Sequence, residues 1–242
     1  GVQKSAGEKL QRTLSVVTSN KVVAILTGML ITMIIQSSGA TTVMVVTFVN
    51  AGLISLAQSA GVIFGANIGT TITAWIVSIF GFNFKISAFA VPVVGLGYFL
   101  SIFKKRKYQN IGEAIMGFGL LFLGLSGLSS VFTPDQLGWM LNIKGTGASA
   151  IILGFLIGIV VTALLHSSSA FSAIVITMAY NGLISWELAA AMTLGSNVGS
   201  TVDSIMASMG TSANGRRAAL IHVMFNLFGT IVVLCFLKPF LD

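Results

Sequence analysis

The strongest constraint on the fold of this chain is an internal duplication, in which one stretch of sequence recurs 130 residues later. Residues 36–42 read Gln-Ser-Ser-Gly-Ala-Thr-Thr, and residues 166–172 read His-Ser-Ser-Ser-Ala-Phe-Ser. The same register reaches residues 65–71, Gly-Ala-Asn-Ile-Gly-Thr-Thr, and residues 195–201, Gly-Ser-Asn-Val-Gly-Ser-Thr, without a gap. Similar composition alone rarely keeps so long an ungapped register. We therefore infer two copies of one unit, each with a serine-rich stretch, here termed the first tip (residues 36–42) and the second tip (residues 166–172).

The composition places both copies in a membrane. Hydrophobic residues make up 55% of the chain and charged residues 8%, and the mean hydropathy is +0.96. A soluble globule of this size needs more polar surface, so we expect an integral membrane protein. The net charge of +7 would otherwise suggest nucleic acid. In membrane proteins, however, basic residues mark the cytoplasmic face, so the expected partner is the lipid bilayer and not nucleic acid.

Each tip interrupts an apolar stretch of unusual length. A helix needs about 20 residues to cross the hydrocarbon, and the stretches 22–54 and 148–184 are too long for one crossing and too short for two. A re-entrant hairpin whose tip reaches the midplane fits this length, provided that protein or water satisfies the tip. Other apolar stretches are long enough to cross: 60–80, 86–103, 111–132, 186–209 and 218–237.

Three of these crossings separate the two hairpins, and an odd number means that the two copies enter the membrane in opposite orientations. That arrangement is typical of inverted-repeat transporters. The predicted fold is an all-α integral membrane protein with two inverted repeats, each with a re-entrant hairpin followed by a discontinuous transmembrane helix. The predicted parts are an interfacial N-terminal helix (1–20), repeat 1 (21–110), a linking helix and loop (111–147) and repeat 2 (148–242).

The basic residues predict the orientation. In this topology, ten of the 13 lysines and arginines lie on the same side as the N-terminus, and only Lys85, Lys144 and Lys238 lie on the other. This asymmetry predicts a cytoplasmic N-terminus. The alternative explanation of the basic cluster at 104–107 is a soluble partner.

The tips combine two chemistries. Hydroxyl and amide oxygens are hard, neutral ligands that suit a small alkali cation. A helix that restarts after a break also directs free N–H groups and the positive end of its dipole at the break, which attracts an anion. Two facing tips would therefore form one anion site with cation sites beside it, where inverted-repeat carriers bind substrate.

The second repeated segment allows two interpretations. Gly61, Gly65 and Gly69 recur every four residues, which is typical of close helix packing. Alternatively, the segment is a discontinuous helix whose unwound carbonyls and polar side chains bind a cation. The recurrence of the amide and hydroxyls in the second copy favours this interpretation, and the predicted sodium ligands are Asn67, Thr70, Thr71, Asn197, Ser200 and Thr201.

Three ionisable groups fall in predicted apolar segments. Asp203 is the one acid deep in a predicted span. Such a residue is costly there and suggests function, as a sodium ligand or a proton-titrating group, with a pair to a neighbouring hydroxyl as the alternative. His166 replaces Gln36 in the second tip, where it would donate to an anion, carry a proton, or be structural. His222 and Asn226 are expected to be buried and to make polar contacts between helices. No catalytic motif is present, so we do not expect an enzyme.

The two tips and the two Gly-x-Asn-x-Gly-Ser/Thr-Thr segments resemble the paired glutamine-serine repeats of type II sodium–phosphate cotransporters, especially their short bacterial relatives. The resemblance covers roughly residues 20–235 and departs from the family at Gly39, where a third serine is usual, and at His166, where glutamine is usual. It implies only the membrane part of such a protein, without the soluble helical domain that many bacterial relatives carry.

The resemblance implies sodium-coupled import of inorganic phosphate by alternating access across the bacterial inner membrane, with sodium as the co-transported ion and no organic cofactor. It places phosphate at Gln36, Ser37, Ser38, Thr41, Ser167, Ser168 and Ser169. Because His166 could donate to an anion, we add it to the predicted phosphate ligands. The alternatives are a sodium- or proton-coupled carrier of another small oxyanion or a dicarboxylate, and a channel or non-transporting membrane module. The glycine-rich stretch 111–132 is compatible with a homodimer.

Overall fold

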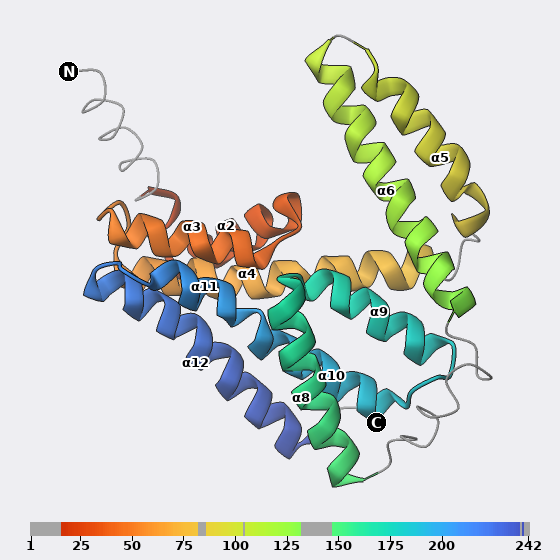
Figure 1. The fold of residues 1–242 in the computed structure, drawn as a ribbon. Helices are drawn as coiled ribbons and strands as arrows, with labels where there is room; N and C mark the ends of the chain where they lie inside the picture. The colour runs from red at the N-terminus through yellow and green to blue at the C-terminus, as the bar shows by residue number, and fades with distance from the viewer. Residues whose placement is uncertain (1–15, 82–85, 104, 132–146, 238, 240–242) are drawn as a thin grey trace. The chain divides into compact units, whose positions relative to one another are not determined.

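The computed structural model describes residues 16–81, 86–103, 105–131, 147–237 and 239. Within these residues every regular element is helical (Figure 1). The elements are α2 (Lys21–Ile35), α3 (Ser38–Asn50), α4 (Leu56–Ile76), the π-helix η1 (Val77–Gly81), α5 (Ile86–Ser101), α6 (Arg106–Val131), α8 (Ala148–Leu165), α9 (Ser168–Tyr180), α10 (Trp186–Gly199), α11 (Thr201–Ser208) and α12 (Ala213–Cys235).

The chain divides into two compact units. The first contains residues 1–73, 145–172 and 186–242, and the second contains residues 74–144 and 173–185. Both tips belong to the first unit, whereas α5 and α6 belong to the second. Most of the predicted interfacial helix (1–20) and the end of the predicted linking segment (111–147) lie outside the described residues.

Both tips break a helix at the predicted place and by the same means. Gln36 (φ 59°) follows the last residue of α2 and caps it, His166 (φ 52°) does the same for α8, and α3 and α9 begin two residues after these caps. These are the two residues other than glycine with positive φ in the described chain. The left-handed conformation costs a residue with a side chain roughly 1–2 kcal/mol, and such strain is often found at functional sites.

Paired glycines bring the helices of each copy into close contact. In the first copy, a Cβ on Gly28 would collide with the backbone of α4, and one on Gly65 would collide with the backbone of α2. In the second copy, a Cβ on Gly158 would collide with the backbone of α10, and one on Gly195 would collide with the backbone of α8. The glycines of the two copies are 130 residues apart, so the duplication extends from sequence to helix packing.

Helices α2, α3, α4 and α12 of the first unit share an apolar core. Helix α3 presents Val45, Val46 and Val49 to this core, and α12 contributes Ala218 and Ala219. Helix α11 contacts both α3 and α12. In the second unit, α5 packs on α6, and Val77, Ala90 and Phe122 form a smaller core.

The prediction of a discontinuous helix at residues 65–71 is wrong for the first copy, because α4 runs unbroken from Leu56 to Ile76. The polar side chains there bond back to carbonyls of their own helix, as Asn67 Nδ2 does to Ile63 O (2.9 Å). In the second copy, a helix ends at Gly199 and another begins at Thr201, but Ser200 between them keeps a right-handed helical conformation. The interruption there is slight.

Three helical stretches of the described chain are long and apolar enough to cross a membrane: Leu56–Ile79, Ala148–Leu165 and Ala213–Cys235. Helices α2, α3 and α9 and the residues Phe89–Ser101 are apolar but shorter. The composition and these helices are those of a membrane protein.

Candidate functional site

The two tips meet at one small polar pocket in the first unit. Its volume is about 40 Å³, room for about three water-sized spheres. Ten residues line it: Gln36, Ser37, Ser38, Gly39, His166, Ser167, Ser168, Ser169, Ser200 and Asp203. Seven of the eight predicted phosphate ligands are among them. The lining contains hydroxyls, an amide, an imidazole and one carboxylate, but no lysine or arginine.

Both tips cap the helix that follows them. Ser37 Oγ accepts a hydrogen bond from Ala40 N (3.1 Å), and Ser167 Oγ accepts one from Ala170 N (3.2 Å). Serine is a preferred residue at a helix N-terminus for this reason. The first N–H groups of a helix have no intrahelical acceptor. Helices α3 and α9 therefore both begin with their electropositive ends at the pocket lining.

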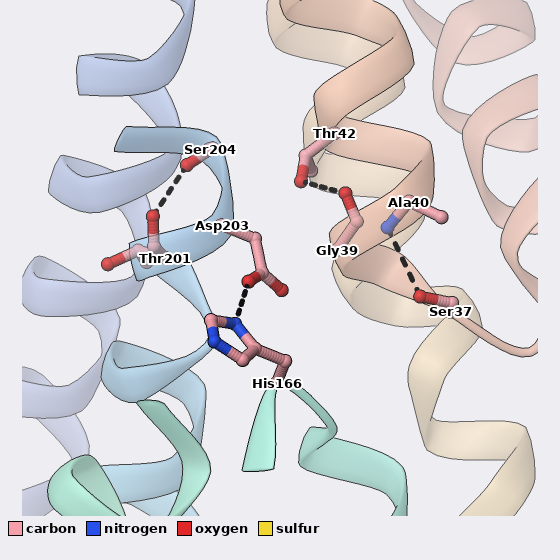
Figure 2. Close-up of polar contacts among 8 residues, drawn as sticks. All are labelled: Ser37, Gly39, Ala40, Thr42, His166, Thr201, Asp203 and Ser204. Atoms are coloured by element: carbon pink, nitrogen blue, oxygen red, sulfur yellow. Dashed lines mark hydrogen bonds and ion pairs between the residues drawn. The ribbon is translucent and has the colours of Figure 1, made fainter. Parts of the chain in front are cut away.

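The first residue of each tip also contacts a later residue of the same copy, and the two contacts are equivalent. Thr73 Oγ1 donates to Gln36 Oε1 (2.8 Å). In the second copy, His166 Nδ1 lies 2.6 Å from Asp203 Oδ1 (Figure 2). An amide–hydroxyl pair in one copy is thus replaced by an imidazole–carboxylate pair in the other. The side chain of His166 is 54% exposed and that of Asp203 is 20% exposed.

Thr41 is the predicted phosphate ligand that the pocket lining leaves out. It is buried behind the first tip, where its hydroxyl donates to Ser37 O (3.0 Å) and accepts from Thr32 Oγ1 (2.9 Å). Its equivalent in the second tip is Phe171, and there Thr162 Oγ1 donates to Ser196 Oγ instead (2.8 Å). In this structure Thr41 supports the tip from behind.

Among the predicted sodium ligands, Ser200 and Asp203 line the pocket and the other five do not. Four of the hydroxyls bond back to a carbonyl of their own segment: Thr70 to Ala66, Thr71 to Ile68, Ser200 to Asn197 and Thr201 to Val198. Asn67 does the same, and Asn197 is exposed. Sodium binding at all seven residues stays a prediction.

The structure adds Thr73 to the site. Besides Gln36, its hydroxyl lies 3.5 Å from Ser169 Oγ of the second tip. The repeat register aligns Thr73 with Asp203, and this alignment was the available signal for it.

A buried polar pair lies behind the pocket. His222, which is fully buried, has its Nδ1 3.0 Å from Ser204 Oγ, and Ser204 Oγ donates to Thr201 O (2.8 Å). Because the serine proton is used in that bond, His222 Nδ1 must be the donor to Ser204. Among the described residues, Nε2 is the one buried side-chain nitrogen or oxygen without a partner. No partner for His222 was identifiable from the sequence.

These features define the class, an integral membrane protein with a duplicated serine-lined site. The family follows from comparison with known proteins: the chain matches the family described as Na+/Pi-cotransporter over residues 1–130 and 140–238, and it belongs to that family. The family is one of transporters. No solved structure matches the chain.

Relatives include proteins with and without a described activity. "Uncharacterized protein YqeW" of Bacillus subtilis is 31% identical over 98% of this chain and 76% of its own length. "Putative inorganic phosphate export protein YjbB" of Salmonella typhimurium is 30% identical over 99% of this chain, which spans 44% of that protein. "Sodium-dependent phosphate transport protein 2C" of Rattus norvegicus is 38% identical over 37% of this chain and 15% of its own length.

Proposed function

We propose that this protein transports inorganic phosphate together with sodium, by alternating access, and holds phosphate between the two serine tips. The observation that carries the proposal is the pocket where both tips and the N-termini of α3 and α9 come together. Both copies of the duplicated serine-rich stretch therefore line one pocket.

The pocket chemistry suits a small oxyanion. Hydroxyls and first-turn N–H groups donate hydrogen bonds, and each helix N-terminus carries roughly half a positive charge. A volume of about 40 Å³ favours an inorganic ion over a dicarboxylate. The lining offers no permanent cation, so a doubly charged phosphate beside Asp203 needs added positive charge.

Sodium supplies that charge in the proposed mechanism. Carboxylate and hydroxyl oxygens are ligands that suit a hard cation, and Asp203 and Ser200 both line the pocket. The sodium-dependent activity in the name of the rat relative supports the same choice. His166, through Asp203, would link the second tip to the cation.

The duplication supports an inverted-repeat carrier. We assign repeat 1 to residues 21–110 and repeat 2 to residues 148–242, with α2–α3 and α8–α9 as re-entrant hairpins and a cytoplasmic N-terminus. Helices α2, α3 and α9 have 15, 13 and 13 residues, and a crossing needs about 20. Helix α8 has 18 residues, and we assign it to a hairpin because it breaks at His166 as α2 breaks at Gln36. Inverted repeats of this kind place their substrate at the midplane, between hairpin tips.

The gradients determine the direction of transport, because a coupled carrier is reversible. A tenfold sodium gradient provides about 1.4 kcal/mol per ion, and moving one charge through 100 mV provides about 2.3 kcal/mol. Two sodium ions cancel the charge of doubly charged phosphate and leave about 2.8 kcal/mol, or roughly hundredfold accumulation. A third ion would add about 3.7 kcal/mol. With an inward sodium gradient the result is import, although the Salmonella relative is named for export.

Uptake of radiolabelled phosphate into proteoliposomes tests the proposal. An inward sodium gradient should drive uptake, and an equal potassium gradient should not. Ser38→Ala and Ser168→Ala should each abolish most of this uptake, because both serines line the pocket. Ser59→Ala is the matched control, since Ser59 is also a buried serine but lies outside the lining.

The same vesicles test the other substrates and the direction. Sulfate, arsenate and succinate are added as competitors, and loading the vesicles with phosphate and sodium measures efflux. Uptake that is independent of the cation, or equal in the two tip variants and the control, would contradict the proposal. Saturable uptake of another anion instead of phosphate would favour a carrier of that anion.

A further inference from the structure

The fourth residue of each tip faces the opposite copy, and the two copies differ there. Ser169, the third serine of the second tip, has its hydroxyl 3.5 Å from Thr73 Oγ1 in the first copy. The equivalent residues in the other half are Gly39 and Asp203, which face each other across the site in Figure 2. A contact between two hydroxyls on one side corresponds to a glycine opposite a carboxylate on the other.

Gly39 leaves space that a side chain would fill. A Cβ at this position would collide with Asp203 Oδ2 and would lie 3.3 Å from Cγ of the same residue. The conformation of Gly39 does not require glycine, because its φ is not positive. Alanine is also a better helix former than glycine, and Gly39 lies in the first turn of α3. The local helix therefore does not explain the missing side chain, but the neighbouring carboxylate does.

His166 determines which oxygen of Asp203 faces this space. A carboxylate only accepts hydrogen bonds, so His166 Nδ1–H donates to Oδ1 at 2.6 Å. That bond orients the carboxylate with Oδ2 toward Gly39. Among the described residues, no side chain or backbone group donates to Oδ2.

Two serines share the pocket with Asp203. Ser38 and Ser200 line the same pocket as Gly39 and Asp203. The Ser200 hydroxyl donates its proton to Asn197 O (2.8 Å), which leaves its lone pairs free to bind a cation. An ionised oxygen, neutral hydroxyl oxygens and a small volume are what a partly dehydrated alkali ion requires.

We propose that Gly39 opens a position for one alkali cation beside Asp203 Oδ2, and that the size of this opening determines which cation the carrier uses. The proposal rests on the proposed function, because it concerns the ion coupled to phosphate. It goes further in assigning cation selectivity to a residue of the first tip that has no side chain.

The test is Gly39→Ala in the whole chain, with phosphate uptake measured against sodium and lithium concentration. We expect the half-maximal sodium concentration to rise about tenfold or more, as is typical when the surroundings of a metal ligand are altered. Lithium is smaller, so its half-maximal concentration should rise less, and the preference for sodium over lithium should fall. Gly229→Ala is the control, since a Cβ there meets nothing within 4 Å.

A paired substitution keeps the test independent of simple damage to the fold. Gly39→Ser should lower the thermal unfolding temperature because its side chain meets Asp203. Adding Asp203→Thr rebuilds the Ser169–Thr73 pair on the other side, so the double variant should regain most of that loss. Residues in contact show such non-additivity. Additive losses would overturn the proposed contact.

Cation binding without phosphate separates this proposal from the proposed function. The unfolding temperature of the detergent-solubilised protein is measured in sodium, lithium and potassium chloride. Stabilisation by sodium that is weakened in Gly39→Ala and retained in Gly229→Ala supports the cation position, even if wild-type vesicles take up no phosphate. Equal cation dependence of the two variants overturns it, even if sodium-coupled phosphate uptake is observed.

Discussion

The packing of α2 on α4 gives the most direct test of the structure, through Gly65→Ala. The added Cβ would collide with Ile25 O and would lie 2.8 Å from Met29 N. Both are backbone atoms, so no rotamer change relieves the collision. The helices must instead move apart and lose the contacts made around Gly28 and Gly65.

The expected cost follows from two opposing effects. Overpacking typically costs about 1–3 kcal/mol, and a collision with rigid backbone belongs at the upper end, about 3 kcal/mol. Alanine recovers about 1 kcal/mol through its better helix propensity. The net loss is about 2 kcal/mol. At about 2–4 °C per kcal/mol for a chain of this size, the unfolding midpoint should fall by about 4–8 °C.

Thermal unfolding of the purified protein, followed by tryptophan fluorescence, measures this shift. Gly195→Ala should give a similar loss, because Gly195 meets Phe155 O in the second copy as Gly65 meets Ile25 O in the first. Gly229→Ala, in open space, should be neutral or slightly stabilising. If Gly65→Ala and Gly195→Ala unfold at the temperature of Gly229→Ala, the close packing described here is wrong.

Three other substitutions test the site and the polar pair behind it. Ser37→Ala removes a helix cap worth about 1 kcal/mol and should weaken phosphate binding, measured as a higher half-saturating concentration of phosphate in the uptake assay. Asp203→Asn should reduce the sodium dependence of uptake, since the pocket loses its fixed negative charge, and an unchanged sodium activation curve would rule this role out. Ser204→Ala leaves the His222 Nδ1–H without its acceptor, so the unfolding free energy should fall by about 1–3 kcal/mol, and an unchanged value would mean that another acceptor is available.

The position of both helix breaks was predictable because the same polar stretch occurs in both copies. A polar stretch within an apolar run is costly unless the backbone turns, and the same stretch recurs at residues 36 and 166. Both residues adopt the left-handed conformation and both following serines cap a helix. A duplicated pattern with a clear physical cost is therefore a reliable guide to local structure.

The interruption expected in α4 was wrong because the same residues fit a continuous helix equally well. Side chains such as Asn67 and Thr70 bond back to carbonyls three or four residues earlier, which satisfies them without unwinding. The glycines beside them serve the contact with α2. Sequence alone does not separate a polar residue that bonds its own helix from one that binds an ion, because both need the same atoms.

The pairing of His166 with Asp203 could have been predicted from the repeat register, but not from either residue considered alone. The sequence indicated a role for each residue separately, although each aligns with a member of the Gln36–Thr73 pair. Seen as pairs, the two halves of the pocket differ in their ionisable groups, because the carboxylate and the imidazole both belong to the second copy. The helix N-termini are equivalent, so attraction for an anion comes from both halves, whereas attraction for a cation is concentrated where Gly39 faces Asp203. An anion bound between the tips and a cation bound on one side would neutralise each other, and binding of either would then favour binding of the other.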